Sequence, residues 1–376
     1  MSVKVIITNL DSRKAFDIFN IISSKGIRSV RIFSGSWVKF LFLKYAYNGS
    51  VMQIKDVSVV LSIINICNKN PRDKFVLLPI EEEFMLQIYN SKYQLPDNLF
   101  FLFPSKESFD LTRDKNLFSN FCNESGFPIP KEYYYEDLCK ANLLPKDLIV
   151  KPSIGSGSKG IEYISSMRQL KTLKISNFKE CIIQEKINQS NPVEAALFLC
   201  KEGDIVSYYG HKRIRTSPKE GGVTVFSKCT ANKDILGISK SVLMKLNWSG
   251  FAMIEFMYDS ETKSYKIIEL NPRIWGSIML SEYCGANFMQ SYIDLCLSKT
   301  ASAPLINENT YIRWFFPYDL IDYIKGGFKL DVFWKLNRHN TCFINFSYST
   351  KLRSVIFLIA QVFSFNNLKK IINKIF

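Results

Sequence analysis

Two glutamates lie inside apolar stretches of this 376-residue sequence. Glu255 stands in the run Phe-Ala-Met-Ile-Glu-Phe-Met, and Glu269 stands in Ile-Ile-Glu-Leu. A carboxylate within a buried strand costs free energy unless it is paired or bound to a metal. If the two stretches form a hairpin that turns near Thr262, the two glutamates lie opposite each other on one face. Like charges at that separation repel, so a cation between them is expected.

The residues after Glu269 extend this set. Because side chains alternate along a strand, Asn271 and Arg273 lie on the same face as Glu269. Two carboxylates and one carboxamide supply the oxygen ligands that Mg²⁺ takes in proteins. Arg273 beside them suits an oxygen of a phosphoryl or acyl-phosphate group. The alternative is a buried glutamate that pairs with an arginine for structural reasons alone.

A glycine-rich loop follows Lys151 and consists of Gly155, Ser156, Gly157, Ser158, Lys159 and Gly160. Its spacing fits the pattern of dinucleotide sites, but a strand follows it where that pattern requires a helix. Ile161 follows the last glycine where a P-loop has its lysine, so that loop type is also excluded. Two interpretations remain: an ordinary turn, or a hairpin loop that folds over phosphates. Lys151, at the end of a buried strand, favours the second because it neutralises phosphate charge.

A basic stretch further along the chain could meet an anion. Alternation places His211, Arg213 and Arg215 on one face of a strand and Lys212 on the other. Such a face suits an anionic substrate, and a solvated strand edge is the alternative. The segment Gln-Glu-Lys-Ile that begins at Gln184 follows an apolar strand and is uninformative by itself.

Three regions are expected to position these residues. An opening strand, a helix with an apolar stripe and a second strand predict a β-α-β unit with a parallel sheet. A helix is expected over residues 112–125, and the segment Gly126-Phe-Pro-Ile-Pro ends it and forms a joint. Short strands joined by hairpins then indicate an α+β domain built on antiparallel sheet, followed by a mainly helical end. The expected regions are 1–110, 111–300 and 301–376.

The order of these pieces resembles the ATP-grasp superfamily, and most closely the carboxylate–amine ligases related to the large subunit of carbamoyl phosphate synthase. The resemblance runs from about Lys4 to Asn287. Its most specific stretches are the thirteen residues that begin at Ile149 and the ten that begin at Ile268. It implies an N-terminal α/β (pre-ATP-grasp) domain and a two-lobed ATP-grasp domain. With the helical C-terminal extension, the expected fold class is α/β and α+β.

The resemblance implies a role for each matching residue. The nucleotide phosphates would be contacted by Lys115, Lys151 and the loop of Gly155, Ser156, Gly157, Ser158, Lys159 and Gly160. Backbone groups of a hinge would hold adenine, and one glutamate would hold the ribose; these are Glu185, Lys186 and Ile187, and Glu194. The metal ligands would be Glu255, Glu269 and Asn271, while Arg273 and Arg213 would lie near the acyl phosphate and its carboxylate precursor.

The implied activity is amide formation at the expense of ATP, with Mg²⁺ or Mn²⁺, on small-molecule carboxylate and amine substrates. A polysaccharide or secondary-metabolite pathway is one setting for such a ligase. No protein nucleophile is required, which agrees with the presence of only two histidines and no evident Cys-His or Ser-His set. The alternatives are a nucleotide-binding protein with a membrane-peripheral or regulatory role, and a small-molecule kinase.

The composition indicates which partners and which cellular compartment to expect. The net charge of +15 points to anionic partners, but its excess is diffuse, so nucleic acid is not expected as a partner. Nine cysteines without a C-x-x-C pair fit free thiols in a reducing cytoplasm rather than a disulfide framework. No signal peptide or membrane span is expected.

The end of the chain carries apolar residues at helical spacing and lysines without acids. Two interpretations are open: packing on the grasp domain, which is favoured, or contact with an anionic membrane.

Overall fold

The computed structural model describes residues 2–54, 58–155, 160–173, 175, 178–189, 192–217, 223–301, 304–314, 341–344 and 351–362. The loop residues Ser156, Gly157, Ser158 and Lys159 and the tail 363–376 lie outside these ranges. Among the described helices, none has the length and apolar composition needed to cross a membrane.

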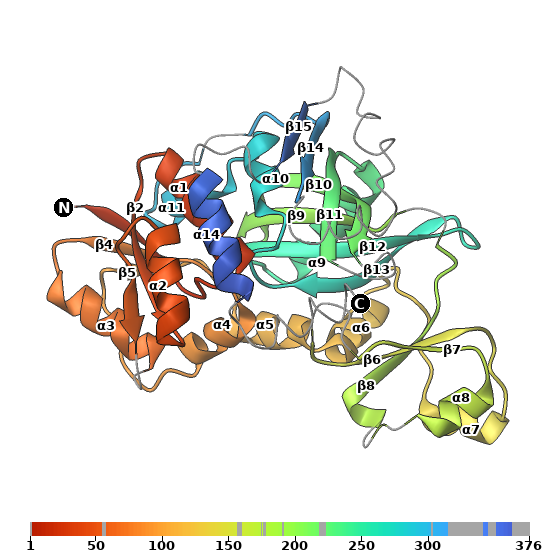
Figure 1. Ribbon diagram of the computed structural model, residues 1–376. Helices are drawn as coiled ribbons and strands as arrows, with labels where there is room; N and C mark the ends of the chain where they lie inside the picture. Colours follow the sequence, from red (N-terminus) through yellow and green to blue (C-terminus); the bar gives the residue numbers. More distant parts are fainter. Residues whose placement is uncertain are drawn as a thin grey trace.

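The N-terminal region is a five-stranded parallel sheet with the order β3-β2-β1-β4-β5 (Figure 1). Helices α1 and α2 cover one of its faces, and α3 and α4 cover the other. The strands are β1 (Val3–Ile7), β2 (Arg28–Ser34), β3 (Met52–Ile54), β4 (Lys74–Leu77) and β5 (Leu99–Phe100). The helices are α1 (Arg13–Ser24), α2 (Trp37–Ala46), α3 (Val59–Lys69) and α4 (Glu82–Tyr89).

The predicted β-α-β start is confirmed. Alternation along β1 sends Val5 and Ile7 into the core under α1 and Ile6 into the core under α3 and α4. The Ser12 side chain accepts a hydrogen bond from the backbone N–H of Ala15 and so caps α1. A strand that is buried on both faces is what a parallel sheet between helices requires.

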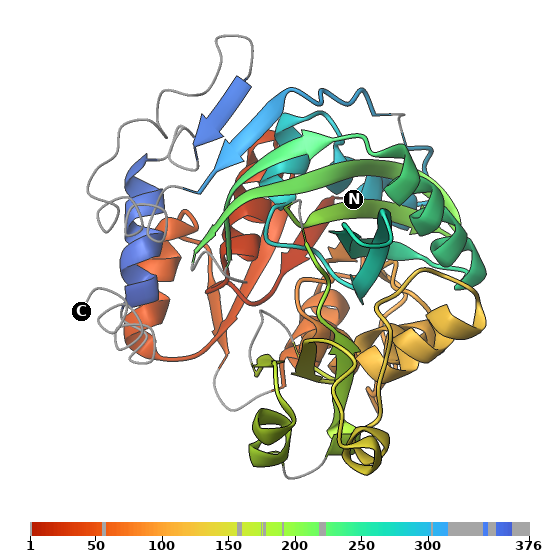
Figure 2. The same cartoon turned by 90° about the vertical axis from the view of Figure 1, so that its right-hand side faces the viewer.

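A second region contains a seven-stranded sheet, ordered β13-β12-β9-β10-β11-β14-β15, and a separate three-stranded lobe, ordered β7-β6-β8 (Figures 1 and 2). The large sheet comprises β9 (Glu194–Lys201), β10 (Asp204–Ser217), β11 (Val223–Thr230), β12 (Gly250–Asp259), β13 (Ser264–Asn271), β14 (Thr310–Arg313) and β15 (Thr341–Ile344). The lobe comprises β6 (Leu148–Pro152), β7 (Glu162–Ile164), β8 (Cys181–Glu185), α7 (Tyr135–Ala141), α8 (Met167–Thr172) and the 3₁₀ turn Phe178–Glu180. The hairpins predicted for this region are confirmed by its antiparallel pairings.

The helix expected over residues 112–125 is divided in two, and that expectation is corrected. Helix α5 (Lys106–Arg113) ends before Asp114, and α6 (Lys115–Glu124) begins after it. Asp114 has an extended backbone, and its carboxylate accepts hydrogen bonds from the N–H groups of Asn116 and Leu117. An aspartate N-cap therefore starts a new helix, which makes Lys115 its first residue.

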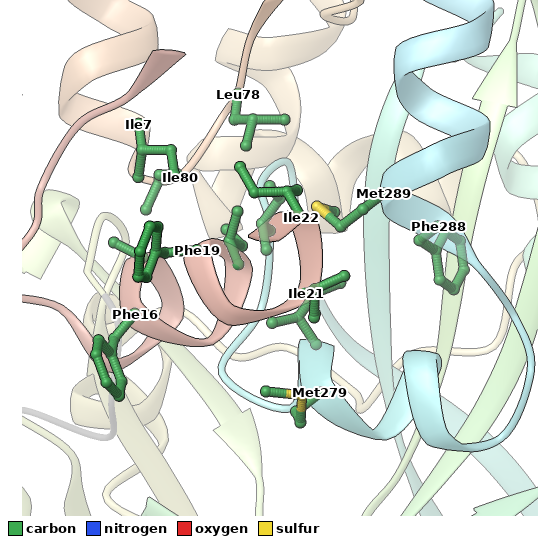
Figure 3. Close-up of a cluster of buried hydrophobic side chains, with 14 of the residues drawn as sticks. Ile7, Phe16, Phe19, Ile21, Ile22, Leu78, Ile80, Met279, Phe288 and Met289 are labelled. Carbon is green, nitrogen blue, oxygen red and sulfur yellow. The ribbon is translucent and has the colours of Figure 1, made fainter. Parts of the chain in front are cut away.

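Helix α1 joins the two regions. In Figure 3, Phe16, Phe19 and Ile22 of α1 lie with Ile7 of the parallel sheet, and Met279 and Met289 of the second region approach the same helix. The last two come from α10 (Ile278–Tyr283) and α11 (Phe288–Cys296). One continuous core therefore connects the N-terminal sheet to the helices behind the large sheet, while helix α9 (Lys233–Lys245) packs on the opposite side of that sheet.

The C-terminal part contains a helix, as expected, and two strands that extend the large sheet. Helix α14 (Lys351–Val362) lies beside α2 in Figure 1. Phe357 stacks on Phe16, with 4.3 Å between ring centroids, and is 3% exposed. The C-terminal helix therefore packs on the protein, as favoured. The predicted partner was wrong, because the helix packs on the N-terminal region and not on the expected ATP-grasp domain. Phe357 also meets the ring of Tyr47, directly after α2, and the apolar stripe of α14 by itself does not reveal these partners.

Candidate active site

A cavity of about 1620 Å³ lies between the three-stranded lobe and the large sheet. The lobe contributes Lys151, the large sheet contributes Glu255 and Glu269, and α1 contributes Arg13. Predicted site residues that line the cavity are Lys115, Lys151, Gly155, Glu185, Lys186, Ile187, Arg213, Glu255, Glu269, Asn271 and Arg273. The structure thus brings residues from three separate parts of the chain to one space.

The carboxylate pair has the predicted geometry. Strands β12 and β13 are antiparallel, and Glu255 is directly opposite Glu269. Glu255 is 8% exposed. Its carboxylate accepts a hydrogen bond from the guanidinium of Arg213, and the two groups form an ion pair. Burial and the neighbouring Glu269 raise the pKa of Glu255, while Arg213 acts in the opposite direction. A second cation at this point would relieve the like-charge repulsion.

Asn271 connects the pair to Arg273. Its Nδ2 donates to Glu269 Oε1 at 3.0 Å, and its Oδ1 accepts from Arg273 Nη2 at 3.0 Å. Arg273 also donates from Nε to Glu82 Oε1 at 3.1 Å, so α4 of the N-terminal region holds the guanidinium in place. A guanidinium that is fixed in this way can orient a phosphoryl oxygen.

The oxygen donors fit magnesium. Among the described residues, no group of three or more His, Cys, Asp and Glu side chains is placed to hold a metal. Mg²⁺, however, commonly uses only one or two carboxylates and completes its shell with water and substrate phosphates. Glu255 and Glu269 supply two carboxylates, and Asn271 Oδ1 keeps a second lone pair.

Two lysines face this carboxylate pair. Lys115 Nζ donates to Gly155 O at 2.8 Å and lies 4.0 Å from Glu269 Oε2. Lys151 is 8% exposed, and burial lowers its pKa to about 8, with Glu269 acting in the opposite direction. A buried ammonium beside carboxylates is a ready partner for an anionic group. Gly155 and Gly160 border the loop residues that lie outside the described ranges.

The hinge forms an apolar compartment of the cavity. Glu185 ends β8 and is fixed by Lys146 at 3.1 Å, and its N–H donates to Lys131 O at 2.9 Å. Apolar side chains from the lobe, the hinge and the large sheet line the neighbouring wall: Ile149, Ile161, Ile187, Met257 and Ile268. A flat heterocycle could be buried between these side chains while backbone groups of the hinge bind its edge.

The ribose role expected for Glu194 is not supported. Glu194 opposes Phe256 across the β9–β12 pair, so its side chain lies on the face away from Glu255. Its carboxylate is 3.2 Å from Lys212 Nζ and accepts from Tyr265 OH at 3.2 Å. It is absent from the cavity lining among the described residues, whereas its neighbour Val193 is present. The strand period puts this glutamate in an internal polar network instead.

Sequence reasoning missed two residues that shape the site. Arg13, the first residue of α1, donates from Nη2 to Gly276 O at 2.9 Å. Glu82, the first residue of α4, holds Arg273. These partners are separated by 263 and 191 positions along the chain, so no local spacing could indicate either contact.

Comparison with known proteins gives a consistent result. A family model described as an ATP-grasp domain matches residues 112–277. Acetyl-CoA carboxylase 1 of Arabidopsis thaliana is 24% identical over 174 residues, which is 40% of this chain and 8% of the plant protein. The chain therefore matches only a small part of that relative's length.

Solved structures share the fold over a longer stretch. The biotin carboxylase of Campylobacter jejuni, in a complex described as β-γ-ATP, has a TM-score of 0.60 and 15% identity over 81% of this chain and 74% of its own. The biotin carboxylase domain of the Hydrogenobacter thermophilus 2-oxoglutarate carboxylase, with MgADP and bicarbonate, has a TM-score of 0.61 and 14% identity over 82% of this chain and 73% of its own. At this identity the likeness shows the fold.

Proposed function

We propose that the protein is an ATP-dependent ligase that joins a carboxylate to an amine, and the match of residues 112–277 to an ATP-grasp domain supports this proposal. The observation that carries the proposal is the convergence of two opposed carboxylates with two lysines in one cavity. Glu255 and Glu269 face each other, and Lys115 and Lys151 lie on the other side. That arrangement suits a nucleoside triphosphate, whose phosphates the lysines would contact, together with a metal ion at the carboxylates.

In this proposal the nucleotide lies across the cavity. The adenine lies in the apolar compartment at Ile187, and the triphosphate extends toward Lys115 and Lys151. The two ammonium groups neutralise phosphate charge where it would otherwise repel an incoming carboxylate. Magnesium, held by Glu255, Glu269 and Asn271, would supply further positive charge at the phosphate oxygens.

The arginines solve the second charge problem. A carboxylate that attacks the γ-phosphate brings one anion to another, and Arg273 is fixed beside the metal ligands. Arg273 therefore orients an oxygen of the transferring phosphoryl group. Arg213 pairs with Glu255, and it would turn toward the substrate when a metal replaces it at that carboxylate. The amine then attacks the acyl phosphate and gives an amide and inorganic phosphate. No protein nucleophile takes part.

Isotope transfer tests the proposal. Purified protein, ATP and Mg²⁺ are incubated with pools of ¹⁸O-labelled carboxylic acids and amines, and the inorganic phosphate is analysed by mass spectrometry. A ligase of this type transfers one ¹⁸O from the carboxylate to phosphate, and hydroxylamine added in place of the amine yields a hydroxamate. ADP formation with no inorganic phosphate and a phosphorylated product would instead establish a kinase and contradict the proposal.

A further inference from the structure

Helices α2 and α14 have an apolar outer surface. Both helices pack their inner sides on the same core, α2 through Phe40 and Leu43 and α14 through Phe357 and Ala360. Among their residues whose side chains the structure describes, the exposed ones are Lys44 and seven large apolar residues: Trp37, Val38, Leu41 and Tyr45 of α2, and Leu352, Val355 and Ile359 of α14. A surface helix normally has charged and polar side chains on its outer side. The outer surface formed by these seven apolar residues, here called the α2–α14 face, is therefore unusual.

The seven side chains form a continuous surface. Trp37, Leu41 and Tyr45 recur every fourth residue of α2, and the three exposed apolar residues of α14 are separated by three and four positions, so each set follows one side of its helix. The two helices lie side by side in both views of the molecule (Figures 1 and 2). Trp37 and Tyr45 are each 55% exposed, and Leu352 is 62% exposed. A contiguous exposed apolar surface marks a site of interaction with a protein or a membrane.

The charge around the α2–α14 face has one sign. Residues 18–55, which contain α2, carry six Lys and Arg, and residues 351–376, which contain α14, carry five; neither stretch contains Asp or Glu. The nearby Asp11 is already paired with Lys39 of α2 at 2.8 Å. Lys44 is exposed within the face itself. The face therefore combines apolar side chains with positive charge, and such a combination attracts an anionic surface.

We propose that the α2–α14 face is a docking surface for an anionic membrane. The rings of Trp37 and Tyr45 have an apolar body and a polar atom, which suits the headgroup level of a bilayer. Leu41 and Leu352 enter the boundary of the acyl chains, and Lys44 meets the phosphates of the headgroups. Helix α14 then packs on the protein with its inner side and contacts lipid with its outer side, so the two interpretations of the C-terminal stretch are compatible.

Charge also argues against two other occupants of the α2–α14 face. A second copy of the chain, related by a two-fold axis, would bring the same positive surface against itself, because such an interface uses one patch twice. The last fourteen residues of the chain carry three lysines and no acid, so they do not complement Lys44 either. An anionic lipid surface complements both the apolar side chains and the charge.

Vesicle sedimentation of the full-length protein tests the proposal. Vesicles of phosphatidylcholine alone are compared with vesicles of equal parts phosphatidylcholine and phosphatidylglycerol. We expect binding to the anionic vesicles to be roughly tenfold or more tighter than binding to the neutral ones, and to weaken as salt is added. Absence of binding to the anionic vesicles overturns the proposal.

Variants locate the contact. Leu41→Glu combined with Leu352→Glu should weaken binding to the anionic vesicles roughly tenfold or more, and Lys44→Glu should weaken it roughly fivefold or more. Leu143→Glu makes the same chemical change at an exposed leucine of the three-stranded lobe and should leave binding unchanged. Because all these side chains are exposed, each variant should melt as the unmodified protein does. Trp37→Ser adds no charge and should also weaken binding, which gives a second measure if a glutamate variant melts early.

The same assay identifies the other occupants. In one further variant of the full chain, Lys369→Glu, Lys370→Glu and Lys374→Glu reverse the charge of the last residues. Loss of binding in this variant, with binding retained in Leu41→Glu combined with Leu352→Glu, would assign the contact to the end of the chain and overturn the proposal. A dimer in analytical ultracentrifugation that dissociates in Leu41→Glu, from a protein that does not bind vesicles, would assign the face to a second copy and overturn it as well.

Discussion

The two faces of the large sheet treat a buried glutamate in different ways. On the cavity face, Glu255 and Glu269 oppose each other and share Arg213 and Lys115 as neighbours. On the other face, one position along β9 from the row of Glu255, Glu194 is 4% exposed and contacts Lys212 and Tyr265. In the first arrangement two carboxylates oppose each other, whereas in the second a single carboxylate has its own hydrogen-bond and ion-pair partners.

This difference separates a binding site from a structural network. A lone carboxylate in an apolar strand occurs on both faces, so it is a weak sign of function. Two carboxylates in register with each other are a stronger sign, because only a ligand or a metal removes their repulsion. The predictions below test that distinction.

The largest effect is expected from Glu269→Gln. Loss of a carboxylate charge at the metal removes several kcal/mol of stabilisation, so ADP release should fall by roughly 10³-fold or more, while analogue binding stays measurable. Glu194→Gln makes the same chemical change on the opposite face and should keep turnover within twofold. Normal ADP release by Glu269→Gln, assayed with the true substrates, contradicts the metal assignment.

The variant Lys151→Met tests the lysine that the three-stranded lobe contributes to the cavity. Removal of a charged hydrogen-bond donor should weaken ATP-analogue binding by roughly 10–100-fold. The burial that lowers the Lys151 pKa from 10.5 to about 8 opposes folding while the ammonium is charged, and this cost fades as the pH rises through 8 to 10.5. The ligand-free variant should therefore melt at a higher temperature than the unmodified protein at pH 7. Unchanged calorimetric affinity would remove Lys151 from the phosphate site.

Asp17 offers a third kind of buried carboxylate, outside the large sheet. Burial in α1 raises its pKa from 3.8 to about 7, with Arg13 and a hydrogen bond with Trp314 acting in the opposite direction. A raised carboxyl pKa means that stability is lost as the pH rises from about 4 to 7. Asp17→Asn should gain on the order of 4 kcal/mol at pH 8 and nothing at pH 4, as measured by urea unfolding. An equal effect at both pH values would show that titration of Asp17 is not the cause.

The smallest effect concerns stability on the face away from the cavity. Glu194→Gln should lower the free energy of unfolding by about 1–2 kcal/mol, because the hydrogen bonds to Lys212 and Tyr265 lose their charge. A double-mutant cycle with Lys212→Met measures the coupling of that pair. A loss of ATP-analogue affinity in Glu194→Gln, with unfolding unchanged, would restore the ribose role.

Much of the candidate site was readable from the sequence because its parts are local. The short turn between Phe251 and Asn271 predicts the pairing of the two strands. The exact register also depends on an irregularity between Glu255 and Phe256, without which Ile268 would lie opposite Glu255. The break at Asp114 was missed, because the helical pattern around it is continuous, although aspartate is a preferred N-cap. The face of Glu194 was not readable, because the pairing of β9 with β12 joins strands far apart in the sequence.

The sequence by itself determined the β-α-β start, the hairpins of the large sheet, and that opposed carboxylates would need a cation. These properties follow from local backbone geometry and from charge. The sequence did not determine the faces beyond a register irregularity: Arg215, expected on the face of His211 and Arg213, is opposite Phe226 and lies on the other face. Only the tertiary structure decided that Glu82 holds Arg273, that Arg13 reaches the cavity, that His211 shares a row with the carboxylates, and that α14 packs on α2. The physical reason is that these contacts depend on long-range packing of apolar faces, which any of several surfaces could satisfy until the whole chain has folded.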